Sequence, residues 1–347
     1  MRLVAQQGLW TTDYRADAPP AVAVLEVSGA VLAWTVDDPT GPVQVTFTDV
    51  AAADWLWRVL GEDGHVGLVG ALADRTPTAL ELSGVDWAAG ALAPLRRLAL
   101  GHWLRRWWPA GTTDGIADLD AALLDAEIAV LTAAAEAFFA GDTFDSDVAG
   151  LLQPHRGALV GWLRDGDPRV AALIESCAEL AEWPDLADAA APRRQDDYAL
   201  AAGAAGMGGS GAIASGTASL AWSAVPPGVF DAAEDTVSWS VGSAADGVVT
   251  AEIGIAVIGP ATGVAVRFDG IDGVLDARGR ASLVLPMAES AAWNRDWSAP
   301  EIAVAGRPDP GETREVRDRI RAFARARLSA PGADAFLAEI LAAEADY

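Results

Sequence analysis

Apolar residues near the start of the chain alternate with polar ones in short runs, which is typical of half-buried strands. VAVLEV (22–27) and AVLAWTV (30–36) flank a Ser28-Gly29 pair, and this combination predicts a β-hairpin. PVQVTFT (42–48) alternates in the same way and predicts a third strand. The chain is therefore expected to begin with a sheet.

Helical signals follow these strands. Asp49 is placed to cap a helix over AAADWLWRVL (51–60). A longer helix is expected from about Ala88 to Trp108, and Pro109 ends it because a residue before proline is pushed out of the α region. We interpret HVGLVGALA and TALELSGVDW, between the two helices, as extended segments. Residues 1–110 are accordingly predicted to form an α+β domain.

Residues 111–195 show apolar positions three and four apart, the spacing of amphipathic helices. One helix is predicted to break at Pro154. Another is predicted to start at a capping Asp167 with Pro168 in its first turn. Residues 185–197 are interpreted as a linker. This part of the chain is therefore expected to be a helical domain.

Alternation returns in residues 196–307, where short strands are separated by Gly, Pro and Asp turns at regular spacing. This pattern predicts an antiparallel β-sandwich, with strands in YALAAG, ASGTASLAWSAV, DTVSWSV, VVTAEIGIAVIG, TGVAVRFDG, ASLVLPM and EIAVAG. Residues 308–347 are expected to form two helices divided at Ser329–Gly332. The predicted fold is α+β and multidomain: an N-terminal α+β domain, a helical middle segment, an antiparallel β-sandwich and a C-terminal helical tail.

Charge and composition exclude several classes of partner. The formal net charge of −25 repels phosphate backbones and anionic lipid, so neither nucleic acid nor a membrane surface is an expected partner. The apolar fraction of 52% is sufficient for packed cores. No apolar run of membrane-spanning length occurs, and MRLVAQQGLW lacks the pattern of a signal peptide. We therefore expect a soluble, cytoplasmic protein.

The cationic residues and the cysteine exclude several chemistries. All 24 cationic side chains are arginines, which excludes the P-loop lysine, the kinase lysine and Schiff-base catalysis. Cys177 is the single cysteine, so neither an intramolecular disulfide nor a cysteine-cluster zinc site can form. Its helical, apolar surroundings predict a buried and unreactive thiol.

The candidate catalytic and metal motifs are weak. The glycine-rich stretch at 203–216 lacks the lysine of a phosphate-binding loop and is interpreted as a flexible loop between strands. His65, His102 and His155 have no local partner at metal-ligand spacing. RFDGIDGVLDARG resembles two β-turns, although its carboxylates would be the first candidates for a metal or catalytic site: Asp269, Asp272 and Asp276. We assign no cofactor and no metal.

GHWLRRWWPAG (101–111) concentrates tryptophan and arginine in one stretch. On a helical projection, Trp103 and Trp107 share the apolar face, whereas Arg97, Gly101 and Arg105 lie opposite, where solvent is expected. Two interpretations remain open. The arginines stack on tryptophans and pair with the protein's own carboxylates, or the stretch anchors a partner protein. The candidate partner-binding residues are Trp103, Arg106, Trp107, Arg96 and His102, together with Trp293 and Trp297 of WNRDW.

The C-terminal tail also carries a stripe of arginines at helical spacing: Arg314, Arg317, Arg321 and Arg325. Carboxylates on the same predicted helix favour a solvated or intramolecularly paired face. A docking surface for an acidic partner, or for the acidic body of this protein, is the alternative.

The function predicted from these observations is that of an interaction or scaffold subunit, without enzymatic activity, in a bacterial multi-protein assembly. It would bind one or more other proteins through Trp/Arg-rich surfaces, and association between copies of the chain is left open. One alternative is a hydrolase that uses carboxylates, with or without a metal. The other is a sandwich that binds carbohydrate or another ligand through stacking tryptophans: Trp222, Trp239, Trp293 or Trp297.

Overall fold

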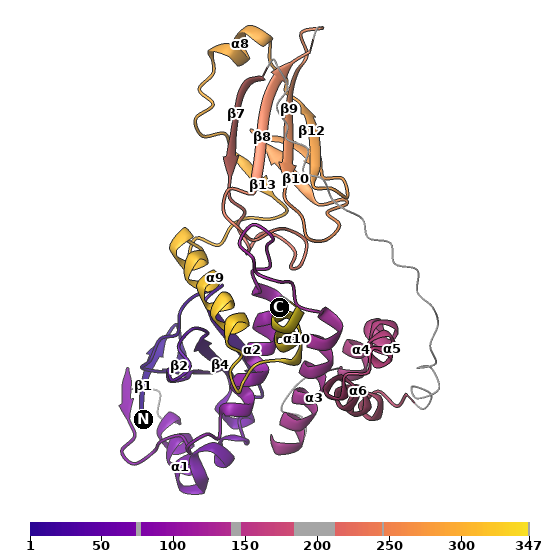
Figure 1. The fold of residues 1–347 in the computed structure, drawn as a ribbon. Helices are drawn as coiled ribbons and strands as arrows, with labels where there is room; N and C mark the ends of the chain where they lie inside the picture. The colour runs from indigo at the N-terminus through magenta and orange to yellow at the C-terminus, as the bar shows by residue number, and fades with distance from the viewer. Residues whose placement is uncertain (74–77, 140–146, 184–211, 245, 346–347) are drawn as a thin grey trace. The chain divides into compact units, whose positions relative to one another are not determined.

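The computed structural model describes residues 1–73, 78–139, 147–183, 212–244 and 246–345. The chain divides into two compact units (Figure 1). The first unit comprises Met1–Trp107, Leu119–Pro192 and Arg325–Tyr347. The second comprises Trp108–Asp118 and Arg193–Ala324. Helices and antiparallel sheets occur together, so the predicted mixed α+β character is confirmed. The four-part division is finer than these two units and stays a prediction.

An antiparallel sheet forms one layer of the first unit, with strand order β3-β4-β5-β2-β1-β6. The predicted hairpin is confirmed: β3 (Val22–Val27) pairs with β4 (Ala30–Thr35) across the turn at Gly29. Gly29 has a φ of +74° and packs against the backbone of residue 49, which leaves no room for a side chain. The other strands are β1 (Arg2–Gln6), β2 (Leu9–Thr12), β5 (Gln44–Phe47) and β6 (Ala79–Glu81).

Two predictions near the start of the chain, one of a helix and one of an extended segment, need correction. Asp49 caps the short 3-10 helix η1 (Val50–Ala52), and the α-helix α1 (Leu56–Leu72) begins later. The segment 65–73 was predicted to be extended, but its residues 65–72 are helical within α1 and Ala73 is the C-cap. An apolar run without charged residues fits the period of a helix as well as that of a strand, so packing decides which one forms. Gly64, Leu68 and Leu72 are buried at four-residue spacing.

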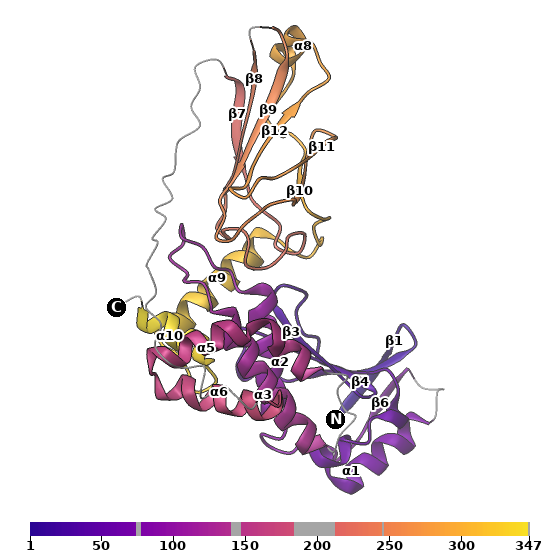
Figure 2. The ribbon, with the colours of Figure 1, turned by 90° about the vertical axis from the view of Figure 1, so that its right-hand side faces the viewer.

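Two long helices of the first unit, α2 and α3, lie side by side (Figure 2). Helix α2 runs from Ala93 to Trp107, shorter than predicted at its start. The other helices are α3 (Ala121–Phe139), α4 (Val148–Leu152), η2 (Gln153–His155), α5 (Arg156–Asp165), α6 (Pro168–Leu180) and α10 (Leu337–Ala345). The break at Pro154 and the Asp167 cap of α6 are both confirmed, the latter by a hydrogen bond from the Arg169 amide.

The second unit contains a four-stranded sheet, β12-β9-β8-β7, and a three-stranded sheet, β11-β10-β13. Buried residues of both sheets form one hydrophobic cluster that includes Trp239, Phe268 and Trp297. The strands are β7 (Ala212–Ala218), β8 (Val237–Ser243), β9 (Val249–Ile255), β10 (Ala265–Phe268), β11 (Ile271–Val274), β12 (Arg280–Val284) and β13 (Ile302–Val304). A short helix, α8 (Glu289–Asn294), follows β12.

Three features of residues 185–307 differ from the predictions or lie outside the described residues. Strand β11 occupies a stretch that was interpreted as turns, because β10 supplies an edge with which it pairs antiparallel. The end of the glycine-rich stretch, from Ala212 onward, is strand β7 instead of loop. The predicted linker at 185–197, the strand in YALAAG and the rest of the glycine-rich stretch lie outside the described residues.

The two predicted tail helices are confirmed as α9 (Arg314–Ser329) and α10, separated by the segment around Gly332.

The residues Trp108–Asp118 belong to the second unit. They are held there by Asp231, whose buried carboxylate accepts hydrogen bonds from the hydroxyl of Thr112 (3.0 Å) and from the hydroxyl and amide of Thr113 (3.2 Å each).

Candidate functional site

A cavity of about 370 Å³ opens among α2, α3, α4 and β3 of the first unit, and we call it the α2 pocket. Its walls combine aliphatic side chains with a few polar ones. The lining residues are Val24, Leu25, Glu26, Leu98, His102, Arg105, Thr132, Asp147, Val148 and Leu151. Pockets of this size and mixed lining are the usual places where proteins bind small ligands.

Helix α2 supplies Leu98, His102 and Arg105 to this pocket, at intervals of four and three residues that place them on one helix face. From the helical projection, Arg105 is expected on the solvent side, without a function. The structure corrects this assignment, because the guanidinium borders the pocket with half of the side chain exposed. Gly101, assigned to the same solvent side, is buried.

Gly101 is buried because two neighbouring elements approach it closely. A methyl group at this position would lie 2.8 Å from Cγ1 of Ile128 on α3 and 2.9 Å from Cζ of Phe336. Arg97, also expected in solvent, forms an ion pair with Glu127 of α3 and donates to the Ala335 carbonyl. The helix face opposite the tryptophans is therefore a packing face, because α3 and the C-terminal segment cover it.

Asp125 of α3 connects Arg105, at the edge of the pocket, to the imidazole of His155. Its buried carboxylate lies 3.0 Å from Nε of Arg105, as an ion pair without the alignment of a hydrogen bond, and 2.9 Å from Nε2 of His155. An ion pair on one side and a hydrogen bond on the other fix this carboxylate between the two side chains. The contact with Asp125 thus holds the guanidinium of Arg105 at the edge of the pocket.

The environment of His102 favours the neutral imidazole. Burial lowers its pKa, and the positive charge of Arg105 lowers it further, against a smaller opposing effect of Asp125. At neutral pH the ring therefore contributes a hydrogen-bond donor and acceptor to the pocket instead of a charge.

Two carboxylates and one hydroxyl also belong to the polar lining that the described residues form. Glu26 is exposed on β3, and Asp147 caps α4 by accepting a hydrogen bond from the Gly150 amide at 2.8 Å. The Thr132 hydroxyl donates to the Ile128 carbonyl at 2.8 Å, which leaves its oxygen able to accept. The pocket thus offers positive, negative and neutral polar groups beside an apolar wall.

The predicted partner-binding residues of α2 serve several different structural purposes. Trp103 is buried, and its indole donates a 2.6 Å hydrogen bond to the Pro20 carbonyl. Arg96 donates to the carbonyls of Asp38 and Pro39. Arg106 lies over the ring of the half-buried Trp107, 4.2 Å from its centroid. These contacts agree with the interpretation that the arginines stack and pair within the protein.

The two tryptophans of WNRDW are separated by the fold. Trp293 is 58% exposed on α8. Trp297 is a core residue, stacked on Phe268 at a centroid distance of 6.1 Å, and its indole donates to the Ala292 carbonyl. Trp222 and Trp239 are buried as well. Of the four tryptophans considered for sugar stacking, Trp293 alone presents its ring to solvent.

The three candidate carboxylates of the second unit have separate partners. Asp269 pairs with Arg295 at 2.7 Å and accepts from the Glu301 amide. Asp272 pairs on the surface with Arg267, and Asp276 accepts from the amides of the turn that follows it. Within the described residues, no group of three or more potential metal ligands occurs. The turn interpretation holds for the residues around Asp269 and Asp276.

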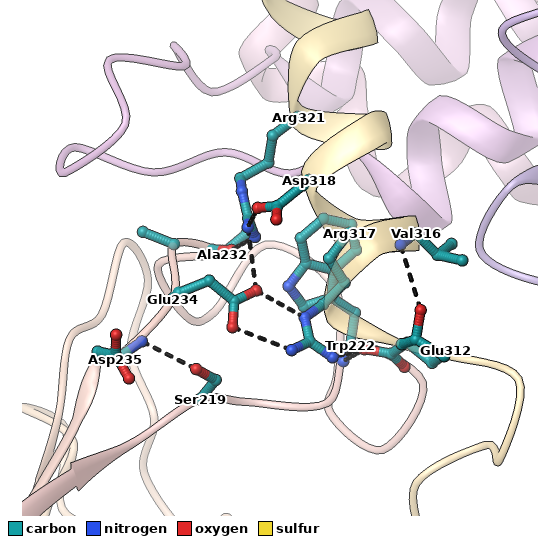
Figure 3. Close-up of polar contacts among 12 residues, drawn as sticks. Ser219, Trp222, Ala232, Glu234, Asp235, Glu312, Val316, Arg317, Asp318 and Arg321 are labelled. Atoms are coloured by element: carbon teal, nitrogen blue, oxygen red, sulfur yellow. Dashed lines mark hydrogen bonds and ion pairs between the residues drawn. The ribbon is translucent and has the colours of Figure 1, made fainter.

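The arginine stripe of α9 is paired within the second unit, in the network drawn in Figure 3. Arg317 and Arg321 both bind the carboxylate of Glu234. Arg317 also contacts Glu312, whose carboxylate accepts hydrogen bonds from the amides of Trp222 (2.6 Å) and Ser223 (2.8 Å). These two arginines are therefore paired within the protein, and because Glu234 lies outside α9, the pairing matches the alternative in which the stripe docks on the protein's own acidic body.

Helix α1 carries an apolar face that was not predicted from the sequence, because this segment was expected to be extended. Val66 is 66% exposed and Val69 is 38% exposed. Three small residues on the same side of the helix are exposed with them, and together the five form what we call the α1 face: Val66, Gly67, Val69, Gly70 and Ala73. The sequence GHVGLVGALA was the signal for this face, because it has no Asp, Glu, Lys or Arg on any side of the helix, whereas only the side of Gly64, Leu68 and Leu72 is buried.

No protein-family model, no curated protein and no solved structure matches this chain. Among the helices that the structure describes, none has both the length and the apolar composition of a membrane span.

Proposed function

We propose that this protein is a non-enzymatic interaction or scaffold subunit of a cytoplasmic, bacterial multi-protein assembly. It binds another protein through the α1 face. The observation that carries this proposal is the exposure of Val66 and Val69 on a helix with no charged residue from Gly64 to Ala73. A contiguous exposed apolar surface is costly in water and is typical of a protein interface.

The partner that fits this face is an apolar helix flanked by basic residues. Gly67 and Gly70 have no side chains, so a second helix can approach closely there. Glu62 and Asp63, at the N-terminal side of the face, are exposed and negative, and the whole chain has a net charge of −25. Basic residues at the rim of the partner helix would complement these charges and accelerate association. The same charges disfavour nucleic acid and anionic membrane as partners.

The proposal includes the finer architecture predicted from the sequence. We propose that the two sheets of the second unit form a β-sandwich, supported by the hydrophobic cluster that residues such as Val241, Phe268 and Val304 build from both sheets. The four-part division at residues 110, 195 and 307 is proposed with it. The hydrolase and sugar-binding alternatives have less support, because the three candidate carboxylates have separate partners and three of the four tryptophans are buried.

The test is site-specific photocrosslinking in the native cell, with the crosslinking residue at Val66 in one strain and at Val274 in a control strain. Val274 is a matched control, because it is 64% exposed and lies on strand β11 of the other unit. We expect a protein crosslinked from Val66 and absent from Val274. Binding of that purified protein to the wild type and to the Val66→Ser/Val69→Ser double variant is then measured.

The double variant should bind at least about ten-fold more weakly, since burial of each valine is worth roughly 1.5 kcal/mol or more. Its thermal unfolding should be unchanged, because both side chains are exposed. If Val66 crosslinks only to a second copy of this chain, the α1 face mediates self-association, and the proposal of a different protein as the partner is wrong. Equal binding by the double variant would overturn the α1 face as the binding surface.

A further inference from the structure

The α2 pocket is separate from the α1 face and has no part in the proposed interaction. We infer that it binds a small zwitterion, an aliphatic α-amino acid. Three features of the lining lead to this ligand class: a guanidinium that is held from one side, two carboxylates at the same cavity, and an aliphatic wall.

The guanidinium of Arg105 provides the site for a carboxylate. Its Nε faces the buried Asp125, whereas half of the side chain is exposed at the pocket. The two terminal nitrogens of a guanidinium match the two oxygens of a carboxylate, which makes arginine the usual residue for such recognition. Because Asp125 holds the side chain in place, little conformational entropy is lost when a ligand binds.

A carboxylate alone does not satisfy the charge of this pocket. Among the described residues that line the cavity, Glu26 and Asp147 carry two negative charges and Arg105 carries one permanent positive charge. His102 does not change this balance, because burial and the nearby Arg105 lower its pKa. A ligand that brings its own cation gains attraction to Glu26 and Asp147, whereas a simple anion is repelled. An ammonium group beside the carboxylate supplies this cation.

The aliphatic wall selects the rest of the ligand. Five side chains give the cavity a hydrophobic surface: Val24, Leu25, Leu98, Val148 and Leu151. A volume of about 370 Å³ lies at the lower end of small-molecule pockets, which suits a single amino acid better than a peptide or a nucleotide. A branched aliphatic side chain would cover this wall and exclude water from the charged side chains of the same cavity.

The test is isothermal titration of the full-length wild-type protein with L-leucine and three analogues. Leucinamide lacks the carboxylate, 4-methylpentanoate lacks the ammonium group, and L-alanine lacks most of the aliphatic side chain. We expect L-leucine to bind, and each analogue to bind at least about ten-fold more weakly, because each loses one of the three contacts. This comparison requires no substitution in the protein.

Variants assign the binding to the α2 pocket. Arg105→Gln and Glu26→Gln should each weaken the binding of L-leucine about ten-fold or more. The control for the first is Arg267→Gln, because Arg267 is similarly exposed, 53% against 51%, and is likewise paired with one aspartate. The control for the second is Glu81→Gln, on strand β6 of the same sheet. Both control variants should bind L-leucine as the wild type does.

A spectroscopic measurement keeps the test decisive if Arg105→Gln fails to fold. The ring signals of His102 in the NMR spectrum of the wild type, assigned by their loss in His102→Gln, should shift on addition of L-leucine. Absence of heat and of this shift at L-leucine concentrations up to about 10 mM would overturn the inference. Equal binding of 4-methylpentanoate and L-leucine would also overturn it, because the ammonium group would then have no role.

Discussion

Arg317 and Glu234 form a two-pronged ion pair in the second unit, with Nε of the arginine 2.9 Å from Oε1 of the glutamate and Nη2 3.0 Å from Oε2 (Figure 3). Both side chains are about nine-tenths buried, and Arg321 donates a further hydrogen bond to the same carboxylate. Burial alone would raise the pKa of Glu234, but hydrogen bonds from Arg317, Ser219 and Arg321 outweigh it and lower the pKa to about 2.

Glu234→Gln should destabilise the second unit by about 3–5 kcal/mol, since removing one charge leaves two buried arginines without their shared carboxylate. Chemical denaturation followed by tryptophan fluorescence measures this loss as an earlier transition. The neighbouring Asp235→Asn is the control, because Asp235 is exposed and asparagine tolerates its φ of +59°. Equal midpoints for the two variants would contradict the role given to Glu234.

Gly101→Ala should destabilise the first unit by about 1–3 kcal/mol, although alanine is the better helix former. The added methyl group would lie within 3 Å of both Ile128 and Phe336, so α2 and its neighbours would have to move apart. Gly161→Ala in α5 is the matched control, since no atom lies within 4 Å of its added methyl group. That variant should instead be stabilised by roughly 0.5–1 kcal/mol. Thermal unfolding of the two variants distinguishes the two directions.

Lowering the pH should destabilise the protein, in part because of His102. Its pKa is lowered in the folded state, mainly by burial, so the unfolded state takes up the proton first as the pH falls. Stability is therefore complete above the unfolded pKa of about 6.5 and is lost progressively as the pH falls from there towards the folded value. His102→Gln should remove this part of the pH dependence in denaturation experiments between pH 7 and pH 5, whereas His65→Gln in α1 should retain it.

Cys177 should react very slowly with thiol reagents in the folded protein. The side chain is fully buried, and burial raises the pKa of the thiol to about 11, so the reactive thiolate is scarce at neutral pH. Labelling should become complete once the protein is unfolded in denaturant. Rapid labelling under native conditions, at the rate of the unfolded chain, would contradict the burial of Cys177 between α6 and α3.

The two tryptophans Trp103 and Trp293, grouped by the sequence as binding residues, should behave differently on truncation. Trp103→Ala removes a buried indole and its hydrogen bond to Pro20, and should cost about 3–5 kcal/mol. Trp293→Ala removes a side chain that is 58% exposed and should change stability by less than about 0.5 kcal/mol. Differential scanning calorimetry of the two variants measures this contrast, which a shared surface role would not produce.

The sequence by itself determined the elements whose signals are local. The hairpin at 22–35 needed only two alternating runs and a turn with glycine. The start of α6 needed only an aspartate before a proline, because the cap and the first turn lie within a few residues of each other. The buried thiol of Cys177 also followed from its neighbours on one helix.

Tertiary structure decided the secondary structure of segments with ambiguous patterns. It also decided the contacts between residues that are far apart in the sequence. The apolar segment 64–73 fits a helix or a strand by its pattern. It is helical because the side with Gly64, Leu68 and Leu72 is buried against the rest of the first unit. Strand β11 exists because β10 provides a pairing edge. Arg105, Asp125 and His155 come from α2, α3 and η2, and no spacing along the chain brings them together. Their meeting depends on how closely α2 packs on α3, which Gly101 permits through a contact that exists only in the folded chain.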